Sequence, residues 1–209
     1  MPLDLWLAFV AASTALLLIP GPTVLLVLSY ALSQGRRVAV ASATGVALGD
    51  FVAMTASLAG LGALVLASAT LFTALKWIGA AYLIWLGVRL LRSAPSEGLE
   101  TMKTDAPLPG RGVFWHAAAV TALNPKSIAF FIAFVPQFVT VGAPLAPQFA
   151  ILIATFVGLA AMNALAYALL ADRLRQTIGK PGIITWLTRG GGIALIGMGV
   201  LTAALRRAT

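Results

Sequence analysis

The sequence predicts an all-α integral membrane protein, and three observations support this fold class. Hydrophobic residues make up 60% of the 209 residues and charged residues only 10%, whereas a water-soluble domain carries about 25% charged residues. The charged residues separate long apolar runs, and about 20 apolar residues suffice for a helix to cross the hydrocarbon core of a bilayer. Proline and glycine interrupt the first and the fourth of these runs. We therefore expect six transmembrane helices, with breaks in the first and the fourth.

The first half of the chain is expected to cross the membrane three times, over residues 5–31, 40–66 and 71–91. No charged side chain lies between Leu5 and Gln34, and only Asp50 lies in the next charge-poor stretch, residues 38–75. That stretch is too long for one helix, and its small residues near 60–70 mark the division. A cleaved signal peptide is the alternative for the first span, but it would begin with a basic segment and have a shorter apolar run.

A hydrophilic linker over residues 93–112 separates this half from the second. It combines prolines and glycines with charges of both signs, as connecting segments do. The second half is expected to cross the membrane over residues 113–136, 148–170 and 183–205. We interpret residues 1–209 as a single transmembrane domain made of two repeats, at about 1–92 and about 113–209.

The positions of the basic residues predict the orientation of the chain. With the N-terminus outside, ten of the fourteen Lys and Arg residues fall in cytoplasmic loops or near the cytoplasmic ends of spans, Lys76 and Lys126 lie elsewhere in spans, and Arg206 and Arg207 lie outside. Lys and Arg favour cytoplasmic loops, so both termini are expected outside. Basic loops beside an anionic leaflet also account for the net charge of +8. No basic–aromatic cluster of the kind that binds phosphate backbones is present, which argues against nucleic acid as a partner.

The two halves carry similar features at corresponding places, which predicts an internal repeat. The first span of each half has a proline break, the second an Ala-Thr pair, and the third a cation three residues before a glycine. These features are Pro20-Gly21-Pro22 and Asn124-Pro125-Lys126, Ala43-Thr44 and Ala154-Thr155, and Lys76 to Gly79 and Arg189 to Gly192. Three spans per half force the halves into opposite orientations, and such inverted repeats with broken helices are typical of secondary transporters. Chance similarity in a chain rich in glycine and alanine is the alternative.

The break in the first span is expected to form part of a substrate-binding site. Pro20 and Pro22 have no N–H, so they leave the carbonyls of Leu16 and Leu18 without helical donors, and Gly21 loosens the turn further. Such carbonyls, and the N–H groups on the other side of the break, must face protein, water or substrate in a membrane. Together they suit a zwitterion. A simple proline kink is the alternative.

Asp50 is the second candidate, because a carboxylate deep in a membrane is costly and usually serves ions, protons or substrates. It lies about ten residues, or roughly 15 Å, into its span. It follows Gly45-x-x-x-Gly49, a pattern that allows close helix packing. We expect Asp50 to carry a proton or to meet a substrate ammonium. A structural ion pair with Lys126 or Lys76 is the alternative.

Polar residues near the second break complete the candidate substrate site. Pro125 frees the carbonyl four residues before it, and Lys126, near mid-depth, is a candidate to hold a substrate carboxylate or to pair with the acid. Lys76, at the start of the third span, is either an interfacial anchor or a site residue. Asn124 and Asn163 are the only asparagines and both lie in spans. Hydrogen bonding between helices is the alternative for both.

The composition excludes several other kinds of chemistry. The chain has no cysteine and one histidine, His116, so disulfides, thiolate sites and multi-histidine metal sites are excluded. No Ser–His–acid arrangement, HExxH motif or pair of intramembrane carboxylates is present, so we expect no enzyme, metal or cofactor. Gly190-Gly191-Gly192 lacks the strand and lysine of a phosphate loop, and helix packing is the better interpretation.

Five motifs follow one another over almost the whole chain in a specific order and spacing. They are Ile19-Pro20-Gly21-Pro22, Gly45-x-x-x-Gly49-Asp50, Lys76-x-x-Gly79-Ala80-Ala81-Tyr82-Leu83-x-x-Leu86-Gly87, Asn124-Pro125-Lys126 and Pro136-Gln137-Phe138. In this order they resemble the lysine exporter (LysE/RhtB) family of bacterial amino-acid exporters. The resemblance implies a small carrier of the bacterial inner membrane that exports amino acids or close derivatives, uses the proton gradient and forms homodimers.

The sequence thus predicts a proton-coupled amino-acid exporter that works by alternating access, with its cavity between the first and fourth spans. Backbone N–H groups and Lys126 would hold the substrate carboxylate, while Asp50 and the free carbonyls would meet its ammonium or carry the exchanged proton. A passive channel or facilitator for small polar metabolites is the alternative. It would need a continuous polar face through the spans, and the sequence offers only scattered polar residues.

Overall fold

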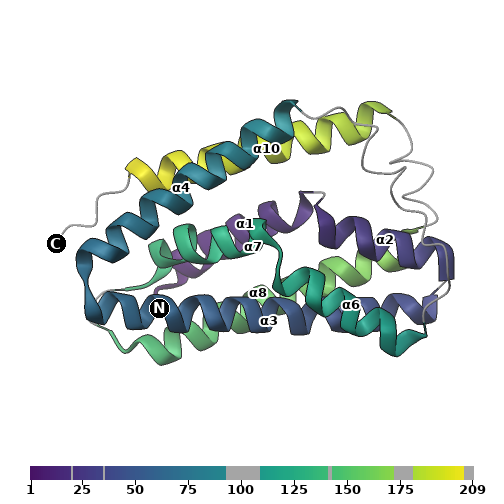
Figure 1. The fold of residues 1–209 in the computed structure, drawn as a ribbon, viewed down its shortest axis with the longest axis horizontal. Helices are drawn as coiled ribbons and strands as arrows, with labels where there is room; N and C mark the ends of the chain where they lie inside the picture. Colours follow the sequence, from purple (N-terminus) through teal and green to yellow (C-terminus); the bar gives the residue numbers. More distant parts are fainter. Residues whose placement is uncertain (20, 35, 93–108, 141–142, 172–180, 205–209) are drawn as a thin grey trace.

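The computed structural model describes residues 1–19, 21–34, 36–92, 109–140, 143–171 and 181–204. The elements in this part of the chain are α1 (Leu3–Leu18), α2 (Pro22–Gln34), α3 (Arg36–Ala67), α4 (Ala69–Arg92), α6 (Gly110–Ala122), α7 (Pro125–Ala129), the π-helix η1 (Phe130–Phe134), the 3₁₀-helix η2 (Val135–Phe138), α8 (Leu145–Leu169) and α10 (Pro181–Ala204). They form an elongated bundle in which α4 and α10 lie side by side along one edge (Figure 1). Within these residues the fold is all-α, as the sequence predicts.

Both predicted breaks are present, and a proline begins the helix that follows each of them. α1 and α2 are bent relative to each other by 57°, and α6 and the segment Pro125–Phe138 by 40°. Pro22 is the first residue of α2 and Pro125 the first residue of α7. These positions suit proline, because the first turn of a helix does not need its N–H groups for internal hydrogen bonds.

Three described helices contain a stretch long and apolar enough to cross a membrane, namely Val40–Ala63, Thr73–Arg92 and Leu145–Leu169. Each bent pair also qualifies when it is counted as one span, which gives up to five spans. The expected sixth span, residues 183–205, coincides with α10, which is not among the described helices that qualify. The protein is therefore a multi-pass membrane protein with three to five candidate spans, where the sequence predicts six.

Glycines allow α3 to pack closely on α6. A Cβ atom added at Gly49 would lie 2.5 Å from the carbonyl oxygen of Ala118, and one added at Gly45 would collide with the carbonyl oxygen of Phe114. Only a glycine fits where two helix backbones approach so closely. The predicted close packing at Gly45-x-x-x-Gly49 is confirmed.

Glycines also allow close packing of α10, and they include two of the three consecutive glycines at residues 190–192. A Cβ atom added at Gly192 would lie 2.7 Å from the carbonyl oxygen of Gly87, and one added at Gly191 would lie 2.7 Å from the Ile19 side chain. At Gly190 an added Cβ would meet nothing within 4 Å. Two of the three glycines therefore serve helix packing, which agrees with the interpretation from the sequence.

The buried interior has two apolar clusters with polar residues between them. The first, here called the aromatic cluster, contains Phe9, Phe130, Phe131, Phe134, Phe138 and Phe156. The second, the valine–alanine cluster, contains Val24, Val27, Val46, Ala164 and Ala168. Along α3, Asp50 stands between Val46 of one cluster and Met54, which belongs to the core around the other. The two clusters thus enclose a polar layer near the middle of the bundle.

Candidate functional site

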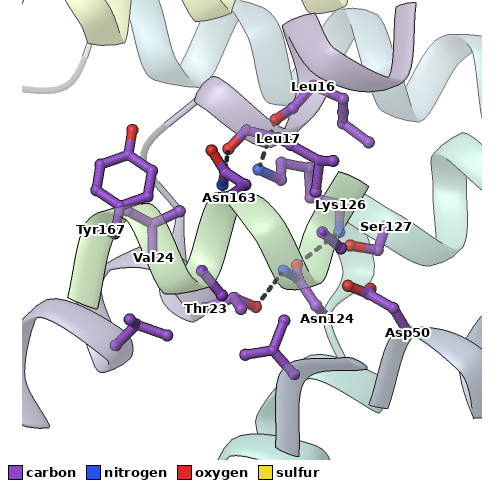
Figure 2. Close-up of a pocket in the computed structure, with 14 residues that line it drawn as sticks. Leu16, Leu17, Thr23, Val24, Asp50, Asn124, Lys126, Ser127, Asn163 and Tyr167 are labelled. Carbon is purple, nitrogen blue, oxygen red and sulfur yellow. Dashed lines mark hydrogen bonds between the residues drawn. The ribbon is translucent and has the colours of Figure 1, made fainter. Parts of the chain in front are cut away.

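A small cavity lies in this polar layer, where both broken helices meet α3 and α8 (Figure 2). Its volume is about 30 Å³, which is room for one or two water molecules. Asp50, Asn124, Lys126 and Asn163 line it, so the structure brings together four of the residues predicted from the sequence. The cavity is much smaller than the pockets of about 300 Å³ or more that commonly hold ligands.

Lys126 binds the carbonyl oxygens at the C-terminal end of α1. Its side chain is 9% exposed, and its Nζ donates hydrogen bonds to the carbonyl oxygens of Leu16 at 3.2 Å and Ile19 at 3.1 Å. The carbonyl end of a helix carries a partial negative charge, which stabilises a cation. Gly21 makes room for this contact, since a Cβ atom there would lie 3.2 Å from Nζ. The ammonium group is therefore held by the first break.

Two residues of α8 bind the carbonyls that lie between these two. Nδ2 of Asn163 donates to the carbonyl oxygen of Leu17 at 3.1 Å, and the hydroxyl of Tyr167 donates to that of Leu18 at 3.4 Å. Asn163 and Tyr167 are four residues apart and so lie on one face of their helix. The carbonyl of Leu18 thus accepts from a side chain of the second half, as expected for a carbonyl that Pro22 leaves without its helical donor. The carbonyl of Leu16 differs from the prediction, because it also accepts the backbone N–H of Ile19 at 3.2 Å.

The second break is held from the first half in a similar way. Oδ1 of Asn124 accepts the backbone N–H of Lys126 at 3.1 Å and so caps α7. Nδ2 of Asn124 donates to Oγ1 of Thr23 at 3.1 Å, and the hydroxyl of Thr121 donates to the same oxygen at 3.4 Å. Thr23 follows Pro22, just as Lys126 follows Pro125. Each residue after a break proline thus contacts the break of the other half.

Asp50 is buried without a bonding partner among the described side chains. It is 2% exposed, and its carboxylate has no hydrogen bond and no cation within 4.0 Å in this part of the structure. The ion pair with Lys126, one of the two alternatives, is therefore not formed here, although Lys126 lines the same cavity. A buried charge is costly unless it is paired. A nearby cation or protonation of the carboxylate would remove this cost.

The other residues predicted for the substrate site do not line the cavity or lie outside the described part of the structure. Pro22 and Pro125 begin the helices after the breaks, and neither they nor Gly21 line the cavity. Pro20 and the side chain of Lys76 lie outside the described residues. Among the residues that are described, no three His, Cys, Asp or Glu side chains gather as metal ligands would.

Sequence reasoning missed Thr23 and Tyr167, which also line the cavity. One signal for Thr23 is its place directly after a break proline, which matches that of Lys126. The signal for Tyr167 is its spacing of four residues from Asn163. Neither signal stands out in a sequence, because hydroxyl residues and tyrosines are common in membrane helices for other reasons.

Comparison with known proteins places these features in a family. The model of the LysE type translocator family matches residues 14–205. A homoserine/homoserine lactone efflux protein of Salmonella typhimurium and one of Salmonella typhi are each 35% identical to this chain, and the alignments cover the full length of both chains. An uncharacterized membrane protein of Vibrio cholerae is 34% identical over 99% of this chain and its own full length. No solved structure matches.

The family match covers most of the chain, and the similarity to the efflux proteins extends from end to end. Both agree with the order of motifs in the sequence and confirm the predicted family. They also confirm that the protein is a transporter and not an enzyme. The chain belongs to the LysE type translocator family.

Proposed function

We propose that this protein exports small amino acids or their derivatives across the bacterial inner membrane in exchange for protons. The observation that carries the proposal is the buried Asp50 carboxylate, which faces the cavity between the two broken helices without a bonding partner among the described residues. The end-to-end similarity to homoserine/homoserine lactone efflux proteins supports an amino-acid substrate. We also propose that both termini lie outside and that the carrier forms a homodimer, from the basic residues and the family resemblance.

In this proposal Asp50 couples substrate to proton by binding one or the other. A deprotonated carboxylate attracts the ammonium group of the substrate, and protonation removes that attraction. Because one carboxylate cannot hold both cations at once, the outward movement of substrate and the inward movement of protons alternate. Lys126 would bind the substrate carboxylate. To do so, its ammonium group has to leave the carbonyls of Leu16 and Ile19.

The small volume of the cavity supports alternating access over a permanently open path. At about 30 Å³ it has no room for an amino acid, so the surrounding helices must move apart before substrate enters. On one side of the polar layer the aromatic cluster fills the interior, with Phe9, Phe130 and Phe131 each 0% exposed. A passive channel would need a continuous polar path through this cluster. The geometry therefore favours a carrier.

The two halves support a rocking mechanism. Each half supplies a broken helix, a long helix that contacts its counterpart, and a helix that packs at the edge: α3 contacts α8, and α4 contacts α10. The contacts at the breaks are also reciprocal: Thr23 of the first half contacts the second break, and Lys126 of the second half contacts the first break. We propose that six spans form two inverted repeats and that movement of one repeat against the other opens the cavity to alternate sides.

Proton coupling is tested with purified protein in vesicles that carry a pH gradient. Asp50→Asn removes the ionisable group with little change of volume, and we expect it to abolish gradient-driven accumulation of homoserine. Asp4→Asn is the matched control, because Asp4 is exposed in the first turn of α1. Accumulation by the Asp50→Asn protein at the level of the control would refute the coupling role. Equilibration without accumulation by the unaltered protein would instead favour a channel.

A further inference from the structure

The carbonyl end of α1 is held by an unusual set of contacts. Four successive carbonyl oxygens, those of residues 16–19, accept hydrogen bonds from side chains at distances of 3.1 to 3.4 Å. The donors are Lys126, Asn163 and Tyr167, and all three belong to the second half of the chain. We call this set of four hydrogen bonds the carbonyl clasp. It joins the first break to α7 and α8.

The clasp lies on the wall of the cavity. Leu16 and Leu17 contribute two of the accepting carbonyls and also line the cavity, as do all three donors (Figure 2). Asn163 and Tyr167 are partly exposed, whereas Lys126 lies deeper. Any movement that separates the first break from α8 enlarges the cavity and breaks the bonds of Asn163 and Tyr167 together. The cavity therefore stays at its small volume while the clasp is formed.

The donors divide into one charged and two neutral groups. Lys126 supplies two of the four bonds, and its ammonium group is attracted to any carboxylate that enters the cavity. Asn163 and Tyr167 carry no charge, so their attraction to a carboxylate is weaker. When Lys126 turns to a substrate, these two neutral donors alone keep residues 17–18 in place.

We infer that Asn163 and Tyr167 are positioning residues that set how often the cavity opens. They act on the broken end of α1 by holding the carbonyls of Leu17 and Leu18. Substrate that draws Lys126 away leaves the clasp with two bonds, which eases opening of the loaded carrier. This inference deepens the proposed function and rests on it for the role of the substrate. The effect of Asn163 and Tyr167 on opening of the cavity does not depend on the proposed function.

The test measures opening without substrate. The natural chain has no cysteine, so a single Val27→Cys substitution reports on one place. Val27 lines the cavity and is 1% exposed, and a thiol there reacts with a water-soluble maleimide only when the cavity opens. Labelling is measured in vesicles for Val27→Cys alone and combined with Tyr167→Phe or Asn163→Leu. Both combinations remove a donor group and keep most of the side-chain volume.

We expect each added substitution to raise the labelling rate about fivefold, the effect of losing one ordinary hydrogen bond on a two-state equilibrium. Tyr82→Phe is the matched control, since it removes a tyrosine hydroxyl from α4, away from the cavity. Labelling that stays within twofold of the Val27→Cys protein in the Tyr167→Phe background would overturn the inference. An equal rise with Tyr82→Phe would also overturn it, because the effect would then be general loosening.

A second measurement separates positioning from a merely structural role. In homoserine exchange we expect Tyr167→Phe to change the maximal rate and to leave KM within about twofold, since its hydroxyl binds the protein and not the substrate. A raised KM with unchanged labelling would assign Tyr167 to substrate binding and contradict the inference. If the Asp50→Asn protein still accumulates homoserine, proton coupling is refuted but the labelling result is unaffected. The two proposals can therefore be refuted independently. Tyr167→Phe alone decides the matter if Asn163→Leu does not fold.

Discussion

The packing of α3 against α6 gives a prediction in which one substitution has opposite effects at two places on the same helix. At Gly49 an added methyl group would lie 2.5 Å from the carbonyl oxygen of Ala118, 2.7 Å from Cβ of Thr121 and 3.0 Å from the backbone nitrogen of Ala122. None of these atoms is at the end of a flexible side chain. α3 and α6 must therefore move apart to accommodate the methyl group.

The magnitude follows from the size of this overlap. Carbon and oxygen atoms are in ordinary contact at about 3.4 Å or more, so the helices have to separate by close to 1 Å. Overpacking of this kind typically costs about 1–3 kcal/mol. Alanine regains about 0.5–1 kcal/mol over glycine in a helix. We expect Gly49→Ala to destabilise the protein by about 1–2 kcal/mol, and to displace the neighbouring Asp50 from the cavity.

Gly60→Ala is the control on the same helix, because an added Cβ there meets nothing within 4 Å. It keeps the helix-propensity gain without the collision, so we expect unchanged or slightly raised stability. The assay is thermal unfolding of the purified proteins in detergent, followed by tryptophan fluorescence, together with homoserine efflux from vesicles. Equal melting temperatures for the Gly49→Ala and Gly60→Ala proteins would refute the packing argument.

Two further predictions concern buried polar side chains. Lys126→Met keeps the length of the side chain but removes the ammonium group that would bind the substrate carboxylate, so homoserine efflux from vesicles should fall at least tenfold. Arg89→Met, at an exposed position, should not change efflux, and equal rates for the two proteins would contradict the role of the ammonium group of Lys126. Gln148→Ala removes four hydrogen bonds to the backbone of Thr140, Ala143 and Pro144 and should destabilise the protein by about 1–3 kcal/mol. Faster hydrogen exchange at the amide of Thr140 would show this loss, and unchanged protection would argue against it.

Several elements could be predicted from the sequence because they depend on local chemistry. Proline cannot donate a backbone hydrogen bond, so the breaks at Pro22 and Pro125 follow from the residue type. Gly45 and Gly49 share one face of a helix at a spacing of four, which is enough to indicate close packing. The central depth of Asp50 follows from its distance along an uninterrupted apolar helix.

Other features of the site could not be predicted, because they depend on how the helices are rotated and tilted against one another. The sequence offered Lys126 as a partner for Asp50 or for a substrate, and in the structure its ammonium group binds the carbonyls of the first break instead. Thr23 and Tyr167 went unnoticed for the same reason. Their hydroxyls acquire partners only when helices distant in sequence come within 3.4 Å.

The sequence by itself determined that the chain is a multi-pass membrane protein of its family, where its helices break, and which charges lie among apolar residues. Those properties come from composition, from the missing N–H of proline and from the order of motifs. The tertiary structure alone decided which side chains bind the carbonyls at the first break. It also decided that Asp50 faces a cavity of about 30 Å³. Hydrogen bonds act over about 3 Å, and the packing of whole helices sets distances on that scale.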